Sequence, residues 1–152
     1  MSIRVLAVGK KHESWVSEGI ERYTKRLKKP WDLDFALIPH SSRQETAARE
    51  EESVRLLAKI KPDEFLVLLD ERGKMLSSPG LSAALRAPLD TGRSVTIVIG
   101  GAYGVDASVH ARANLVWSLS ELVFPHQLVR LILAEQVYRA QEISAGGSYH
   151  HV

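Results

Sequence analysis

Residues 117–139 read WSLSELVFPHQLVRLILAEQVYR. The segment starts as a strand, bends at Pro125 and His126, and continues as a long apolar helix. Between Leu128 and Ala134 the only charged side chain is Arg130, so almost no face of this helix suits water. Such a helix is covered on most sides, either as an ordinary central helix or, as we expect in so short a chain, partly by a second subunit.

Length and composition indicate a globular protein. The chain has 152 residues, which we interpret as a single domain spanning 1–152, and 45% of them are hydrophobic and 25% charged. There is no cysteine, and the six histidines lack metal-ligand spacing, so we expect no disulfide and no metal. The apolar runs are too short for a membrane span or a signal peptide, which predicts a cytoplasmic protein without a membrane partner.

Positive charge is concentrated at the N-terminus. Residues 1–30 hold eight Lys or Arg and three Glu, although the net charge of the whole chain is only +2. A basic lobe of this kind suits a polyanion such as RNA. The alternative is a solvated helix face with ion pairs such as Glu18–Arg22 and Glu21–Lys25.

Short apolar runs alternate with helical patterns along the chain. Strands are predicted at 3–8, 31–37, 64–69, 94–99 and 115–119, and helices at 14–29, 44–59, 78–89, 106–113 and 126–143. We expect Ser14, Ser78 and Asp106 to cap their helices, and Val54, Leu57 and Ala58 to face inward. The third and fourth strands do not alternate with polar residues, which indicates that both their faces are covered. The pattern predicts an α/β fold, a mostly parallel sheet flanked by helices.

Ligands of open α/β sheets bind beyond the carboxyl ends of the strands. This rule selects three segments, namely Leu69 to Glu71, Gly100 to Gly104, and Leu119 to Phe124. The GGAYG sequence is neither a dinucleotide fingerprint nor a P-loop, so it is either a plain turn or a place where backbone approaches a ligand. The third segment either packs as a loop or offers an apolar wall to an adenine ring.

No classical catalytic motif is present, since the chain has neither a G-x-S-x-G elbow nor H-E-x-x-H. His126 lies at a helix start and either caps the helix or acts in function. Arg139 complements the helix dipole or faces a polyanion. The final residues, 144–152, have the composition of a mobile tail.

Several segments together resemble one family. These are VLAVGK, LDERGKMLSSPGL, VIGGAYG, FPHQLVRLILAEQVYRA and the terminal SYH, and they extend over nearly the whole chain. They are similar to the RlmH family of SPOUT methyltransferases. The resemblance implies a C-terminal trefoil knot, a homodimer, the methyl donor S-adenosylmethionine, and N3 of a pseudouridine in 23S rRNA of the assembled ribosome as the acceptor.

The resemblance also implies roles for individual residues. The donor pocket would comprise Leu69, Gly100, Gly101, Leu119, Ser120, Glu121, Leu122, Val123 and Phe124. The terminal Tyr149 and His150 would fold over the site, from the same subunit or the partner, with His150 as the base that removes the N3 proton. Arg139 would hold RNA phosphate or the target nucleotide. Family tails carry Lys or Arg after the Tyr-His pair, whereas His151 and Val152 stand here, which predicts a weaker phosphate contact.

Three alternatives stay open at this point. A SPOUT methyltransferase could act on tRNA or on another rRNA position. A non-catalytic RNA-binding assembly factor could have kept the fold. A flavodoxin-like nucleotide module would share the α/β architecture, although nothing in the sequence marks a flavin phosphate site.

Overall fold

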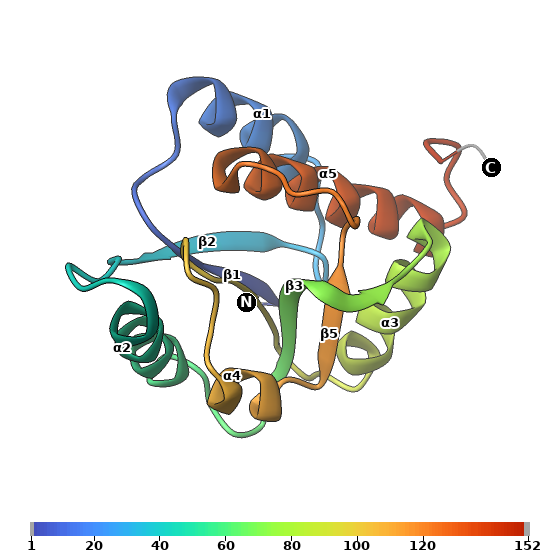
Figure 1. The fold of residues 1–152 in the computed structure, drawn as a ribbon. Helices are drawn as coiled ribbons and strands as arrows, with labels where there is room; N and C mark the ends of the chain where they lie inside the picture. Colours follow the sequence, from blue (N-terminus) through green and yellow to red (C-terminus); the bar gives the residue numbers. More distant parts are fainter. Residues whose placement is uncertain (1, 151–152) are drawn as a thin grey trace.

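A computed structural model describes residues 2–150 (Figure 1). Strands and helices alternate as predicted. Their order is β1 Ile3–Val8, α1 Ser14–Thr24, β2 Leu33–Ile38, α2 Glu45–Leu57, β3 Phe65–Met75, α3 Ser78–Asp90, β4 Val95–Ile99, α4 Ala107–Arg112, β5 Leu115–Ser118 and α5 His126–Ser144.

The five strands form one parallel sheet in the order β2-β1-β4-β3-β5. Helices α1, α3 and α5 cover one face of the sheet, and α2 and α4 cover the other (Figure 1). The central strand β4 is buried along its whole length, which is why its sequence does not alternate. The predicted fold class is therefore confirmed, while the trefoil knot stays a prediction.

Strand β3 departs from the sequence prediction. Its first part pairs with β5 as far as Leu69, and after a register shift Lys74 and Met75 pair with β5 again. Residues 70–73 therefore form a bulge inside the strand, which continues to Met75, and the prediction that the strand ends at residue 69 was wrong. A Cβ on Gly73 would lie 2.7 Å from the backbone of Val116, so only glycine lets the chain return to the sheet here.

Two helix starts lie one residue earlier than predicted. Ser77, not Ser78, is the N-cap of α3, and its hydroxyl accepts a 3.1 Å hydrogen bond from the Gly80 amide. The N-cap of α1 is Glu13, without a side-chain cap, and Ser14 is already helical. Asp106 caps α4 as expected and accepts hydrogen bonds from the amides of Ser108 and Val109.

The inner face of α2 was predicted only in part. Leu57 packs against the core as expected, but Ala58 is exposed and Val54 is 67% exposed, whereas Glu52 is only 3% exposed. A hydrophobic pattern cannot find a helix face on which a carboxylate is buried and a valine is not.

Helix α5 packs against α1 and α3 along one side. Arg130, the charged residue singled out in the sequence, is among the most buried side chains of the molecule, with 1% exposure. The opposite side of α5, including Leu128 and Ile132, is only partly covered within this chain. Of the helices within 2–150, none is long and apolar enough to cross a membrane.

Candidate active site

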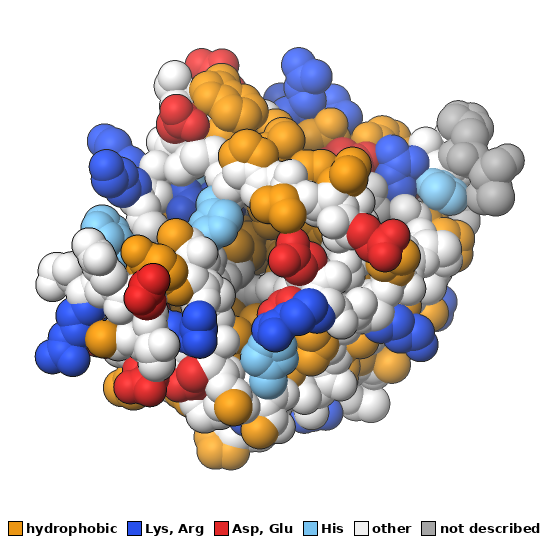
Figure 2. All heavy atoms as spheres, viewed as in Figure 1, with side chains coloured by type: hydrophobic (Ala, Val, Ile, Leu, Met, Phe, Trp, Pro, Cys, Tyr) orange, Lys and Arg blue, Asp and Glu red, His pale blue; other side chains and the backbone are white. Residues whose placement is uncertain are grey.

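A cavity of about 1040 Å³ opens at the carboxyl end of the sheet. Figure 2 shows a hollow near the centre of this face, bordered by hydrophobic and charged side chains. Its wall combines the three strand exits selected from the sequence, because β4, β3 and β5 are neighbours in the sheet. The segments that line it come from the β3 bulge, the loop after β4, the loop after β5, the start of α5 and the start of α2.

The predicted donor-binding residues gather around this cavity. Those that line it are Leu69, Gly100, Gly101, Leu119, Ser120, Leu122, Val123 and Phe124. Glu121, the remaining member of the predicted set, is exposed and does not line it. Their role in binding a donor stays a prediction, but the structure places them where one small molecule could contact them all.

The double glycine is required by close packing. A Cβ on Gly101 would lie 2.5 Å from Oε1 of Glu52 and 3.1 Å from Val8, and a Cβ on Gly100 would lie 3.1 Å from Val105. The turn that follows is closed by a 3.0 Å hydrogen bond from the Gly104 amide to the Gly101 carbonyl. The loop thus lies flat against α2 and β1 and leaves its free edge to the cavity.

The loop after β5 supplies an apolar wall. Ser118 donates a 2.9 Å hydrogen bond to the Ser120 carbonyl, and the Ser120 hydroxyl accepts one of 3.0 Å from the Leu122 amide. These bonds fix the loop while Leu122 and Val123 stay 70% and 80% exposed. Two large apolar side chains so open to solvent beside a cavity indicate a surface that is covered when the protein acts.

The β3 bulge brings a polar cluster to the cavity. Arg72 binds Asp70 with both Nε, at 3.1 Å, and Nη2, at 3.0 Å. Nε2 of His110 lies 3.2 Å from the same carboxylate. The hydrogen bonds from Arg72 lower the pKa of Asp70, so the carboxylate stays ionised well into the acidic range.

The predicted catalytic residues form a second cluster, on the C-terminal half of α5. Arg139 donates to Oε2 of Glu135 at 2.7 Å, and its Nη1 lies 3.0 Å from Nδ1 of His150. Tyr149 donates to the same Glu135 oxygen at 2.9 Å and packs edge-on against the ring of Tyr138. Tyr149 and His150 thus contact α5, while His151 and Val152 lie outside the described residues.

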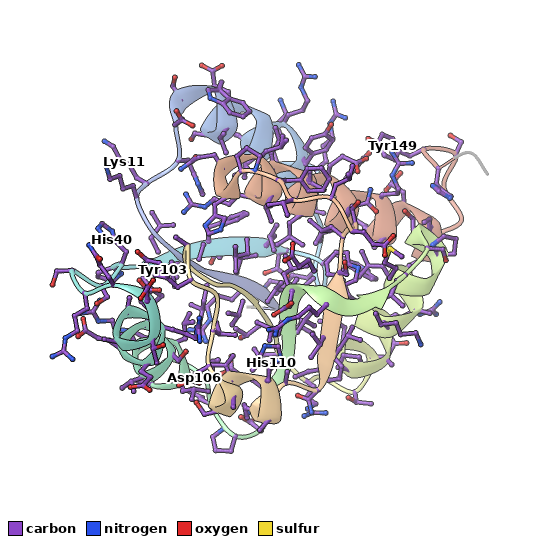
Figure 3. The ribbon with its side chains drawn as sticks, in the orientation of Figure 1. Lys11, His40, Tyr103, Asp106, His110 and Tyr149 are labelled. Atoms are coloured by element: carbon purple, nitrogen blue, oxygen red, sulfur yellow. The ribbon has the colours of Figure 1, made fainter. Side chains whose placement is uncertain are left out.

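The two clusters do not meet within one chain. Arg139, Tyr149 and His150 are absent from the wall of the cavity, and Tyr149 lies at the far end of α5 (Figure 3). Burial and the hydrogen bond to Glu135 raise the pKa of Tyr149 to about 12. Tyr149 is therefore a neutral hydrogen-bond donor at physiological pH and cannot serve as a base.

Known proteins resemble this chain along nearly its whole length. The family model described as "Predicted SPOUT methyltransferase" matches residues 1–150. Proteins named Ribosomal RNA large subunit methyltransferase H are 42% identical in Thioalkalivibrio sulfidiphilus and 40% identical in Desulforamulus reducens, and each alignment covers 99% of both chains.

The chain belongs to the RlmH family of SPOUT methyltransferases.

The fold of this SPOUT chain is found in solved structures as well. A methylase family protein from Neisseria gonorrhoeae superposes with a TM-score of 0.52 at 13% identity, over 99% of this chain and 86% of that one. At so low an identity the likeness concerns the fold alone.

Sequence reasoning missed one feature of this SPOUT site, a group of buried polar side chains behind the cavity wall. Glu52 accepts from the Ser41 amide at 2.8 Å through Oε2, while its Oε1 has no partner among residues 2–150. Arg130 donates to the Lys10 carbonyl at 2.8 Å, and its Nη1 lies 3.3 Å from His12. His126 lines the cavity near Glu52 and Arg130. Desolvation of its ring and the positive charge of Arg130 lower its pKa, against a smaller opposite effect of Glu52. In the sequence, the signal for this buried group was Arg130, the single charge in an otherwise apolar helix segment.

Proposed function

We propose that this protein is a methyltransferase that uses S-adenosylmethionine to methylate N3 of a pseudouridine in 23S rRNA of the assembled ribosome. Membership of the RlmH family and the convergence of the predicted donor residues on one cavity support the proposal. The relatives quoted above are named for ribosomal RNA of the large subunit. A ribosomal substrate would place the protein in the cytoplasm.

The cavity fits the expected donor. Its volume of about 1040 Å³ accommodates a drug-sized ligand, since such pockets typically measure about 300–1,000 Å³. The wall formed by Leu119, Leu122 and Val123 suits an adenine ring, and the glycine loop offers backbone groups at close range. When bound there, the donor would supply an electrophilic methyl group on a sulfonium sulfur.

The remaining chemistry falls to the protein. Neutral N3–H is a poor nucleophile, so a base has to take its proton, and we assign that role to His150. In the structure Arg139, which can only donate, faces Nδ1 of His150 at 3.0 Å, so the lone pair of this nitrogen is engaged. Arg139 would release it when its guanidinium turns to an RNA phosphate, which couples substrate binding to proton removal.

A homodimer would bring the two clusters together. Within one chain Tyr149 and His150 contact α5 and do not line the cavity, so we place the tail of one subunit over the cavity of the other. The exposed Leu122 and Val123 and the partly covered side of α5 offer the apolar surface such a dimer needs. The site would then be complete only in the dimer.

The basic lobe would hold the RNA backbone. Neither of the helix ion pairs considered for α1, Glu18 with Arg22 or Glu21 with Lys25, is found among the described residues. The exposed cations of this lobe thus remain available to phosphates, and their contribution should weaken with salt.

The test is transfer of labelled methyl groups to ribosomes from a strain that lacks the modification. Intact 70S ribosomes, isolated 50S subunits, naked 23S rRNA and bulk tRNA are compared side by side. The proposal expects label in 23S rRNA of assembled particles only, at N3 of one pseudouridine. Label on tRNA would keep the enzyme class and overturn the substrate, whereas absence of donor binding by calorimetry would favour a non-catalytic RNA-binding protein.

A further inference from the structure

Part of the cavity has no role in the proposed reaction. Beyond the predicted donor residues, its wall continues along α2 and the turn after β4, and the lining residues there are Thr46, Arg49, Glu50, Ala102 and Tyr103. The total volume, about 1040 Å³, is already at the upper limit usual for one small ligand. The α2 side of the cavity therefore has room for a second group beside the donor.

Tyr103 presents an aromatic ring on this side. The ring is 40% exposed, although Tyr103 stands on a turn whose backbone is held from two directions. The Gly104 amide bonds the Gly101 carbonyl at 3.0 Å, and Nε of Arg49 donates to the Tyr103 carbonyl at 2.9 Å. An exposed aromatic ring on a fixed backbone suits base stacking, because little conformational entropy is lost when a base stacks on it.

Arg49 adds an available charge. Its Nε is used by the Tyr103 carbonyl, and among residues 2–150 no carboxylate forms an ion pair with it. The two terminal nitrogens of a guanidinium held in this way form a planar fork, which suits a phosphate. Glu50 lies on the same wall, so the local charge is not purely positive.

The neighbouring strand ends carry further exposed basic side chains. Lys10 and Lys11 follow β1, and His40 and Arg43 follow β2, at the same carboxyl edge of the sheet, with Arg43 paired to Glu51 at 3.3 Å. In Figure 3 Lys11, His40 and Tyr103 lie on one side of the molecule, above α2. A basic rim with one aromatic ring, leading to a cavity, is typical of surfaces that guide a single strand of nucleic acid.

We propose that the α2 side of the cavity is an RNA nucleotide subsite, in which the Tyr103 ring stacks on a base next to the methylated one and Arg49 binds its phosphate. The proposal rests on the RNA-methyltransferase function proposed above and names the residues that hold the strand beside the target. The competing occupant of the Tyr103 ring is the adenine of the donor itself.

The test separates stacking, charge and donor binding. Binding of a fluorescein-labelled single-stranded RNA is followed by anisotropy with the donor present, and donor affinity is measured separately by calorimetry. Tyr103→Ala should weaken RNA binding roughly tenfold, while Tyr103→Phe should stay near wild type, because stacking needs the ring and not the hydroxyl. Arg49→Gln should reduce the slope of log Kd against log salt by about 0.7, the loss of one phosphate contact, and Tyr103→Ala should leave this slope unchanged.

The control is Val54→Ala, which alters an exposed side chain on α2 that does not line the cavity. It should change neither RNA nor donor affinity. On ribosomes, Tyr103→Ala should raise KM and leave kcat near wild type. Unchanged RNA affinity in Tyr103→Ala would overturn the subsite, and a loss of donor affinity would assign the ring to the donor instead. Because RNA and donor binding are read without methyl transfer, failure of the proposed reaction can be told apart from failure of the subsite.

Discussion

The hydroxyl of Tyr149 donates a 2.9 Å hydrogen bond to Oε2 of Glu135 and so holds Tyr149 against the last helix of its own chain. Arg139 binds the same carboxylate oxygen, and Cζ of its guanidinium lies 4.8 Å from the centre of the Tyr149 ring. Tyr149 and His150 therefore lie on α5, away from the cavity of their own chain.

This arrangement predicts complementation between two inactive variants. Gly101→Val, whose side chain would meet Glu52, should displace the glycine loop that lines the cavity, and His150→Ala removes the proposed base. The two variants are unfolded, mixed in equal amounts and refolded together. If the tail acts on the cavity of the partner subunit, about a quarter of wild-type activity should return, because about half of the dimers are mixed and each mixed dimer has one intact site. No recovery, with mixed dimers shown by mass spectrometry, would place tail and cavity in the same subunit.

A second prediction concerns the contact between Gly101 and Glu52. Gly101→Ala should destabilise the protein by about 1–3 kcal/mol and weaken donor binding, because its Cβ would lie 2.5 Å from the Glu52 carboxylate. Glu52→Ala should relieve the clash by shortening the side chain at position 52. The double variant Gly101→Ala, Glu52→Ala should therefore lose less stability than the two single variants together, by about 1 kcal/mol or more. Urea unfolding and calorimetry check both quantities, and strict additivity would contradict the contact.

A third prediction concerns the β3 bulge. Gly73→Ala places a methyl group 2.7 Å from the backbone of Val116, which cannot move aside without breaking the ladder between β3 and β5. We expect a loss of about 1–3 kcal/mol in stability and a clear loss of donor affinity, because the bulge carries Asp70 and Arg72 to the cavity.

Gly92→Ala is the matched control for Gly73→Ala. Gly92 has a φ of 76° and open space around its Cβ, so alanine there strains only the backbone. It should lower stability and leave donor affinity unchanged. Equal effects of both variants on donor affinity would show that general destabilisation, not the bulge, governs binding.

Much of the fold was predictable because it depends on local patterns. Strands such as Val95–Ile99 are apolar on both faces, which requires cover on both sides and hence a parallel sheet between helices. The rule that ligands bind beyond strand ends then located the cavity, since the exits of β3, β4 and β5 adjoin. These inferences need only periodicity and chain order.

The features that were missed depend on contacts between distant segments. The return of β3 to the sheet after Leu69 relies on Gly73 fitting against Val116, which no local pattern records. The burial of Glu52 reverses the usual hydrophobic order of a helix face, because its carboxylate is needed by the Ser41 amide. The separation of His150 from the cavity reflects a site that we assign to two chains.

The last prediction is a loss of stability in mild acid, caused by two histidines beside the buried Arg130. Burial and the charge of Arg130 lower the pKa of His12. Desolvation and the charge of Arg130 lower the pKa of His126 as well. A histidine whose pKa is lower in the folded state binds its proton more weakly there than in the unfolded chain. The free energy of unfolding should therefore be highest above pH 6.5, the ordinary pKa of histidine, and fall as the pH drops below it.

Urea unfolding is measured between about pH 8 and about pH 5. The free energy of unfolding should decline towards acid in the wild type, decline less in His12→Gln and in His126→Gln, and decline least in the double variant. A double variant that declines as steeply as the wild type over this range would overturn the assignment to the two histidines. Carboxylates such as Asp70, whose pKa is lowered in the folded state, weaken the fold only at still lower pH and would not explain such a decline.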